Sequence, residues 1–237
     1  MSHPFRFKQF TVDQTDCAMK INTDGVLLGA MAVADNPAAV LDVGTGTGVI
    51  ALMLAQRFTA ARIDAVEIDT DAAQTAKRNF EASPFADRLT LYAAGFENYF
   101  EQYPERKHDL IVSNPPFYIG SLKSPGAKKT LAKHTDTEFF ERLTIAVANH
   151  LTANGCCWLI FPETLAEIIR GLAGTHSLFL QQMFNVQSYP QSQPHRVVMC
   201  LGFKETVPQR NTLVIYNAEK VYSEAYKVLL QPYFLAF

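Results

Sequence analysis

The sequence has few cysteines, and no two of them are spaced as a Cys-x-x-Cys pair. Two of the four are neighbours in an apolar run, where a strand would point them to opposite faces. The pattern therefore favours neither a metal site nor a disulfide framework, and it predicts buried free thiols. The four are Cys17, Cys156, Cys157 and Cys200.

Long apolar runs are also absent. No stretch of about eighteen apolar residues occurs, so no membrane span is expected. The first residues, Met1 to Arg6, lack the basic-then-apolar pattern of a secretory signal, and we expect a cytoplasmic protein. Of the 237 residues, 48% are hydrophobic and 19% are charged, which suits the core of one large domain and is unlike a disordered chain.

The sequence has no excess of positive charge: its net charge is −2 and its pI is about 6.3, which argues mildly against a nucleic-acid partner. The local distribution differs from this average. Residues 121–135 carry five basic or histidine side chains and no acid, which is typical of a loop that faces phosphates. A solvated surface loop is equally consistent with the charge alone. The five are Lys123, Lys128, Lys129, Lys133 and His134.

From about residue 38, short apolar runs alternate with amphipathic stretches. This alternation predicts an α/β fold with a mainly parallel sheet and helices on both faces. The last strands follow one another without long helices between them, which indicates an antiparallel edge. We expect strands at 39–43, 63–67, 89–92, 109–113, 156–161, 178–188, 195–203 and 213–216, and helices at 49–57, 71–82, 137–151, 163–172 and 223–230.

The residues before this alternation form an N-terminal extension. Phe5, Phe7 and Phe10 fall at spacings that suit a short hairpin. We therefore divide the chain into an extension, residues 1–37, which would act as a lid over cofactor and substrate, and a main domain, residues 38–237.

A glycine-rich turn follows the first strand of the main domain and precedes a helix. It contains Gly44, Gly46 and Gly48, but Val49 stands where a dinucleotide-binding fingerprint needs its third glycine. The strand ends with an acid, Asp42, which would repel a pyrophosphate. A cationic sulfonium with an α-amino group suits that carboxylate better, so the motif favours S-adenosylmethionine.

A second acid, Glu67, follows the next strand, nineteen residues after Gly48. A carboxylate at this place can accept the hydrogens of both ribose hydroxyls. Taken alone, a glycine cluster is most simply a tight turn. The combination of acid, glycines and acid at two strand ends favours a site for a nucleoside cofactor.

Asn114-Pro115-Pro116-Phe117 follows the fourth strand, where proline forbids further pairing. The Asn114 carboxamide oxygen and the Pro115 carbonyl oxygen can accept both hydrogens of an aromatic amine, which turns its lone pair towards a methyl donor. Phe117 offers a flat face for a base. The alternative is an ordinary strand-terminating turn. The motif indicates a planar amine but does not choose among DNA adenine, rRNA guanine, tRNA adenine and the glutamine amide of release factors.

With these motifs the sequence resembles the class I methyltransferases. The resemblance implies a Rossmann-like α/β fold with a seven-stranded, mainly parallel sheet and an antiparallel edge strand. The sequence departs from that family after the third strand, where an acid usually receives the adenine amino group and where Gly95 and Phe96 stand instead. The residues that would hold the cofactor are Asp42, Gly44, Thr45, Gly46, Glu67, Ile68, Gly95, Phe96 and Asn114.

Further segments resemble the bacterial tRNA adenine-N6 methyltransferases that modify the purine 3′ of the anticodon in a valine tRNA. They lie at residues 7–10, 17–20, 23–29, 51–57, 114–117, 194–197 and 222–226. The resemblance implies that Thr23 and Asp24 border the methionine end of the cofactor, although a helix N-cap is equally consistent with them. It also implies that Pro116 and Phe117 contact the base and that Lys128, Lys129 and Arg196 contact the RNA.

Three other functions compete with tRNA adenine methylation. The nearest is methylation of another planar amine, in a release factor or in rRNA. A nicotinamide oxidoreductase is disfavoured by Val49 and by the turn at Asn114. A noncatalytic RNA-binding module is disfavoured by the presence of both strand-end acids and Asn114.

Overall fold

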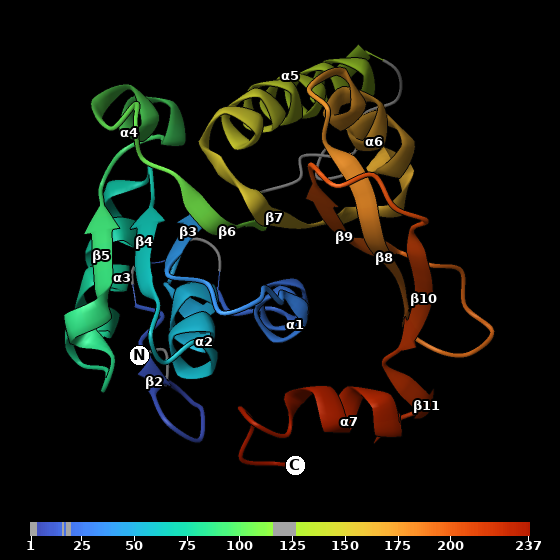
Figure 1. Ribbon diagram of the computed structural model, residues 1–237. Coiled ribbons are helices and arrows are strands. Elements are labelled where there is room, and N and C mark those ends of the chain that lie inside the picture. Colours follow the sequence, from blue (N-terminus) through green and yellow to red (C-terminus); the bar gives the residue numbers. More distant parts are fainter. Residues whose placement is uncertain (1–3, 16, 18–19, 116–126) are drawn as a thin grey trace.

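The structure, a computed structural model, describes residues 4–15, 17, 20–115 and 127–237, and only the backbone of 127–136. Its main feature is an eight-stranded sheet with the order β10-β8-β9-β7-β6-β3-β4-β5 (Figure 1). The five strands from β7 to β5 are parallel to one another. The strands are β3 (Ala39–Val43), β4 (Arg62–Val66), β5 (Leu89–Tyr92), β6 (His108–Ser113), β7 (Leu151–Pro162), β8 (Phe179–Gln187), β9 (Arg196–Gly202) and β10 (Gln209–Val214).

The mainly parallel α/β sheet with antiparallel pairing near one edge is confirmed, but the strand count is eight rather than seven in the described part of the chain. The antiparallel strand β9 lies between β7 and β8, and β10, which is parallel to β8, forms the edge. The apolar pattern indicated only the end of β10 because its first four residues, 209–212, are exposed and polar. Edge strands often carry such residues, since they are solvated on one side.

Helices cover both faces of the sheet, and strand residues alternate between two cores. Leu110 and Val112 of β6 face the core beneath α1, α2 and α3, whereas Ile111 faces the core beneath α4, α5 and α6. In Figure 1, α4, α5 and α6 lie above the sheet, and α1 and α2 lie below it. The helices are α1 (Thr23–Met31), α2 (Val49–Arg57), α3 (Thr70–Glu81), α4 (Phe96–Gln102), α5 (Ala127–His150), α6 (Ala166–Thr175) and α7 (Glu224–Leu230).

Three of these helices differ clearly from the expected ones. Helix α1 was not among the expected helices, although a helix N-cap at Thr23 or Asp24 was considered. Helix α4 was not expected, because its seven residues are too few for a clear helical period. Helix α5 begins at Ala127 rather than at residue 137, so most of the segment expected as a basic loop is helical. Helix α4 follows β5 at the edge where the parallel strands end, which places its first turn near the expected site.

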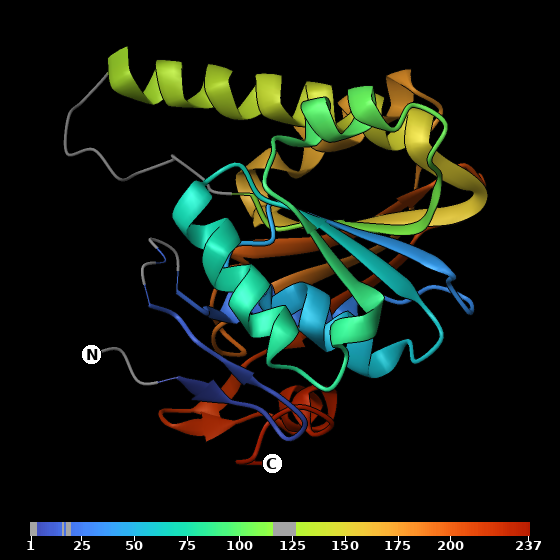
Figure 2. The ribbon, with the colours of Figure 1, turned by 90° about the vertical axis from the view of Figure 1, so that its left-hand side faces the viewer.

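The N-terminal hairpin is confirmed, and it packs on the C-terminal tail (Figure 2). Strands β1 (Phe5–Arg6) and β2 (Thr11–Val12) pair antiparallel, and between them the ring of Phe7 stacks on Phe10 with centroids 4.4 Å apart. The Lys8 ammonium donates to the carbonyl of Phe237 at 2.9 Å. The hairpin is therefore held against the last residues of the chain.

Within the described residues, no helix combines the length and the apolar character that crossing a bilayer requires. In the same residues no group of three or more histidine, cysteine or carboxylate side chains is arranged to bind a metal ion. All four cysteines are free and buried, as the sequence predicts.

Gly48 provides a direct test of the packing between the glycine turn and α3. It has φ +83°, and a Cβ there would lie 2.4 Å from the ring of Phe80. We expect Gly48→Ala to lower the free energy of unfolding by at least about 2 kcal/mol, through the positive φ and the overpacking together. Urea denaturation measures this change.

Gly171 is the matched control, because it lies inside α6 without a positive φ, and a Cβ added there would meet open space. Gly171→Ala should raise the free energy of unfolding by up to about 1 kcal/mol. Equal effects of the two substitutions would contradict the packing described for Gly48.

Candidate active site

The glycine turn between β3 and α2 has a backbone that only glycine adopts readily. Gly44 and Gly46 have φ values of +71° and +56°, and no atom lies within 4 Å of a Cβ built on either. The amides of Gly44 and Thr45 both donate to the carbonyl of Val66 at the end of β4, at 2.9 and 3.0 Å. The turn is thus fixed to the neighbouring strand while its glycines leave open space, which fits close approach of a ligand to the backbone.

Asp42 lies beneath this turn and is completely buried. Its Oδ2 accepts hydrogen bonds from the Thr45 hydroxyl at 2.6 Å and from the Ala51 amide at 3.2 Å. Its Oδ1 is buried without a hydrogen-bond partner. Burial raises the pKa of Asp42 from 3.8 to about 7, despite those two hydrogen bonds. A cation placed near this carboxyl group would favour its ionised form.

Glu67 connects the turn to the start of the next helix. Its Oε2 accepts from the Gly46 amide at 2.8 Å and its Oε1 from the Asp69 amide at 2.9 Å. The residue is 9% exposed. A carboxylate has about four acceptor positions, so one on each oxygen remains for another donor. These free positions leave room for the two ribose hydroxyls that the sequence analysis assigns to Glu67.

Ile68 and Gly95 lie side by side beyond Glu67. Ile68 is 78% exposed although its side chain is apolar. A Cβ built on Gly95, the residue before α4, would lie 3.5 Å from Cδ1 of Ile68, 3.3 Å from Oε2 of Glu97 and 3.5 Å from Oδ1 of Asn98. The side-chain oxygens of Glu97 and Asn98 therefore lie in the space into which an acidic side chain at position 95 would extend. The sequence analysis missed Glu97 and Asn98, because α4 was not expected.

Asn114 is the residue directly after β6, the strand that pairs with β3. The hydroxyl of Ser113 donates to the carbonyl of Val43 at 2.9 Å, which ties the ends of the two strands together. A Cβ built on Gly25 would lie 3.7 Å from Nδ2 of Asn114, so the carboxamide lies against the start of α1. Pro115 is buried. Asn114 and the glycine turn thus follow the ends of two adjacent strands.

Thr23 and Asp24 begin α1, but neither is its N-cap. The cap is Asn22, whose side chain accepts from the Gly25 amide at 2.9 Å. Asp24 instead pairs with Arg196 at the start of β9, with 2.7 Å between Oδ2 and Nε. The structure therefore joins two residues that the sequence assigned separately to cofactor and RNA, and it places both near Asn114.

Other expected site residues are described less fully. Pro116 and Phe117 lie outside the described residues. Lys128 and Lys129 belong to the first turn of α5, and only their backbone is described. Phe96 is the first residue of α4; it is buried, and its ring meets that of Phe139 edge-on at 5.7 Å.

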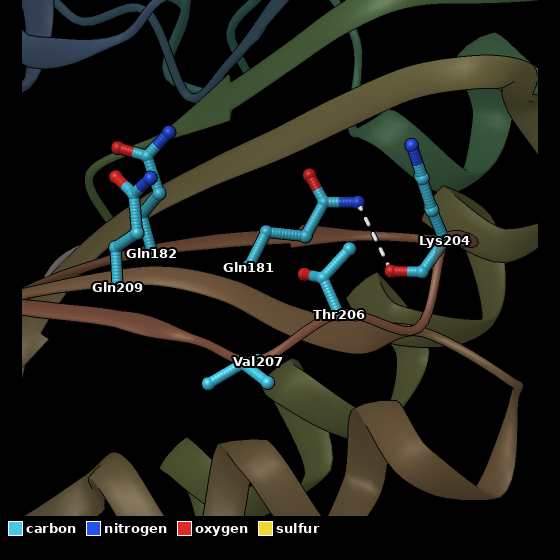
Figure 3. A pocket seen from close by; sticks show the side chains of 6 residues that line it. All are labelled: Gln181, Gln182, Lys204, Thr206, Val207 and Gln209. Carbon is cyan, nitrogen blue, oxygen red and sulfur yellow. Dashed lines mark hydrogen bonds between the residues drawn. The ribbon is translucent and has the colours of Figure 1, made fainter.

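A surface hollow of about 230 Å³ lies elsewhere, beside the first residues of β8 and β10 (Figure 3). The Gln181 side chain donates to the carbonyl of Lys204 at its rim. Because β8 and β10 run in the same direction as β6, their first residues lie at the end of the sheet opposite to Asn114. This hollow is separate from the candidate active site.

The pKa of Asp42 gives a pH-dependent stability. A carboxyl group whose pKa is higher in the folded state stabilises the fold fully below about pH 4, and this contribution is lost as the pH rises to about 7. Asp42→Asn does not titrate. Relative to this variant, the wild type should lose thermal stability from pH 4 to pH 7, and the difference should then stay constant to pH 8. Melting temperatures in the same buffers measure it, and a difference that does not vary with pH would contradict the buried, protonated carboxyl group.

Comparison with known proteins gives a family and several full-length relatives. The model of the methyltransferase small domain matches residues 17–179. The tRNA1(Val) (adenine(37)-N6)-methyltransferase of Pedobacter heparinus is 47% identical over 100% of both chains. The protein of the same name from Flavobacterium psychrophilum is 41% identical over 98% of this chain and 99% of its own, and that of Bacteroides thetaiotaomicron is 40% identical over 99% of both.

Solved structures support the fold. A predicted O-methyltransferase from Agrobacterium tumefaciens superposes with a TM-score of 0.68 at 17% identity, over 89% of this chain and 96% of its own. A ribosomal protein L11 methylase from Lactobacillus delbrueckii subsp. bulgaricus gives 0.53 at 18% identity, over 76% and 78%. Since the curated relatives match along almost the whole of both chains, this chain belongs to the tRNA1(Val) (adenine(37)-N6)-methyltransferases, within the methyltransferase small domain family.

Proposed function

We propose that this chain transfers the methyl group of S-adenosylmethionine to N6 of adenine 37 in a valine tRNA, in the cytoplasm. The observation that carries the proposal is the 47% identity, over the full length of both chains, to a relative named for that reaction. The adjacent ends of β3 and β6 support it, because they bring a nucleoside-binding turn and an amine-binding turn together.

The cofactor lies across the glycine turn in this proposal. Glu67 receives the ribose hydroxyls through its two remaining acceptor positions, and Ile68 covers the adenine ring with its exposed side chain. The oxygens of Glu97 and Asn98 beside Gly95 supply the acceptor that an acid provides elsewhere in the class I family. Thr23 and Asp24 border the methionine end.

The target amine is held at the Asn114 turn. When bound, S-adenosylmethionine supplies an electrophilic methyl group on a positively charged sulfur. The Asn114 carboxamide oxygen and the Pro115 carbonyl oxygen accept the two amine hydrogens and direct the nitrogen lone pair at that methyl group. Their attraction grows as positive charge develops on the nitrogen, so it favours the transition state over the bound substrate. The bond from nitrogen to the methyl carbon forms as the bond from that carbon to sulfur breaks, S-adenosylhomocysteine is the leaving group, and the nitrogen then loses one proton to water.

The N-terminal extension takes part as one wall of this site. Helix α1 lies against Asn114 through Gly25, and the ion pair between Asp24 and Arg196 fixes the start of the helix to β9. Both side chains of this pair are partly buried, so solvent and salt screen their attraction less than that of a surface pair. We propose that residues 1–37 act as a lid that the ion pair holds in place, with Phe117 and Pro116 against the base.

The substrate is tested by labelling. The enzyme is incubated with methyl-labelled cofactor and separate pools of tRNA, rRNA and release factors, and labelled tRNA is digested to nucleosides for mass spectrometry. We expect N6-methyladenosine in the valine tRNA alone. Label only in a release factor or in rRNA guanine would replace the proposal by methylation of another planar amine.

Asn114→Ala tests the amine-binding turn. Loss of one acceptor that acts in the transition state should lower kcat about 100- to 1,000-fold, with a much smaller change in the Kd for S-adenosylhomocysteine. Asn211→Ala, at an exposed position of β10, is the matched control and should keep full activity. Unchanged turnover in the Asn114 variant would contradict the proposed mechanism.

The basic first turn of α5 is proposed to contact RNA phosphates. Replacement of Lys128 and Lys129 by glutamate should weaken tRNA binding and reduce the slope of log affinity against log salt by about two, because each lysine neutralises about one phosphate. The affinity for S-adenosylhomocysteine should stay the same. Lys77 and Lys204, which are exposed and lie outside α5, give a double variant with the same change in charge. Equal tRNA binding by the two double variants would remove α5 from the interface.

A further inference from the structure

Four tyrosine rings follow one another in a row at one corner of the molecule. The ring centroids of Tyr189 and Tyr216 are 5.7 Å apart, those of Tyr216 and Tyr222 are 4.8 Å apart, and those of Tyr222 and Tyr226 are 5.0 Å apart. The planes of successive rings are inclined by 34°, 25° and 10°. We call this row the tyrosine stack.

The tyrosine stack runs from the core to the surface. Tyr226, in α7, is 5% exposed and belongs to the same core as α1 and α2, whereas Tyr189 is 41% exposed. Tyr216 and Tyr222 lie between them and pair across the hairpin of β11 (Tyr216–Ala218) and β12 (Val221–Tyr222). The inner rings therefore support the outer one, and an exposed aromatic ring stands at the end of a rigid base.

The backbone around Tyr189 is also fixed. Its amide donates to the Ser192 hydroxyl at 2.9 Å, and its carbonyl accepts from the Ser192 hydroxyl at 2.8 Å and from the Ser192 amide at 3.0 Å. Pro190 lies inside this turn, where its ring restricts φ. Little conformational entropy is thus left for Tyr189 to lose on binding, which favours a contact that depends on one ring position.

The tyrosine stack lies at the same end of the sheet as the active site. Strands β8 and β10 run in the same direction as β6, so Tyr189 and Tyr216, which follow their last residues, emerge where Asn114 does. The Tyr216 amide donates to the Ser188 carbonyl at 2.9 Å. From β6 to β8 there are three strand spacings, or roughly 14 Å. Arg196, paired with Asp24 near Asn114, begins the strand between β7 and β8.

The side chains around Tyr189 can bind the bases and riboses of RNA. The connection that carries Tyr189, residues 187–195, contains glutamine, serine, proline and histidine but no acid. Amide and hydroxyl side chains can pair with base edges and with 2′-hydroxyls, and an aromatic face binds any base by stacking. The anticodon loop, which is the proposed substrate, carries unpaired bases on both sides of its target adenine.

We propose that Tyr189 is a stacking platform for a second unpaired base of the substrate RNA, in addition to the adenine that enters the active site. This inference rests on the proposed function. The tyrosine stack then positions the anticodon loop of the substrate. One base stacks on Tyr189 and one enters the site at Asn114, so the loop is held at two points. A single-stranded oligonucleotide without the loop geometry engages only one of these points.

The test compares Tyr189→Ala with Tyr189→Phe, which keeps the ring. Val221→Ala, an exposed apolar side chain on the neighbouring hairpin, is the matched control. The Kd for valine tRNA should rise about 5- to 100-fold in Tyr189→Ala, which corresponds to the loss of one stacked base. It should rise less than threefold in Tyr189→Phe and in Val221→Ala. The Kd for S-adenosylhomocysteine should be the same in all four proteins.

A set of anticodon stem-loops, each with one abasic nucleotide, identifies the stacked base. The stem-loop that is abasic at the stacked nucleotide, a position other than the target, should bind the wild type more weakly than the intact stem-loop does. It should bind Tyr189→Ala as well as the intact stem-loop does, because the missing base and the missing ring remove the same contact. Wild-type affinity of Tyr189→Ala for tRNA would overturn the inference. If the wild type methylates no tRNA at all, the proposed function fails; if it does while Tyr189→Ala binds normally, this inference alone fails.

Discussion

The Glu67 carboxylate is the contact on which the geometry of the site depends. It accepts one hydrogen bond from the glycine turn after β3 and one from the start of α3, and so it holds the ends of two neighbouring strands in a fixed relation. Beneath it, Asp42 binds Thr45 and Ala51 and fixes the other side of the same turn. Two largely buried acids therefore shape a loop of positive-φ glycines before any ligand arrives, which is the preorganisation that tight binding requires.

The same edge of the sheet brings together the glycine turn after β3 and Asn114 after β6. Ser113 ties the end of β6 to the end of β3, so the position of Asn114 follows from the strand register. Helix α1 closes this edge through Gly25, and the pair of Asp24 and Arg196 extends it to β9. Beyond β9 the tyrosine stack continues the edge. A cofactor, a target base and a neighbouring base would thus meet structures that all follow from the direction of the strands.

The sequence predicted the elements whose patterns are local. Helix α2 and strand β5 have the expected bounds because a glycine turn and clear apolar runs delimit them. The residues that it missed depend on tertiary contacts. Asn98 belongs to a helix of seven residues, too short to show a period, and it approaches Gly95 only because of where α4 begins. Complete burial of Asp42, and the pairing of Asp24 with a residue 172 positions away, have no signal in a single sequence. The row of four tyrosines likewise joins three segments that only the fold brings together.

The most direct test of the central claim is calorimetry of the wild type with S-adenosylhomocysteine and with its analogue that lacks both ribose hydroxyls. If Glu67 uses its remaining acceptor positions for those hydroxyls, the analogue should bind at least about 10- to 100-fold more weakly, since each hydrogen bond to a charged group contributes about 1.5–3 kcal/mol. A Glu67→Ala variant should bind the two compounds equally. Equal affinities for the wild type would show that the carboxylate only shapes the loop, and would contradict the account of cofactor binding given for this site.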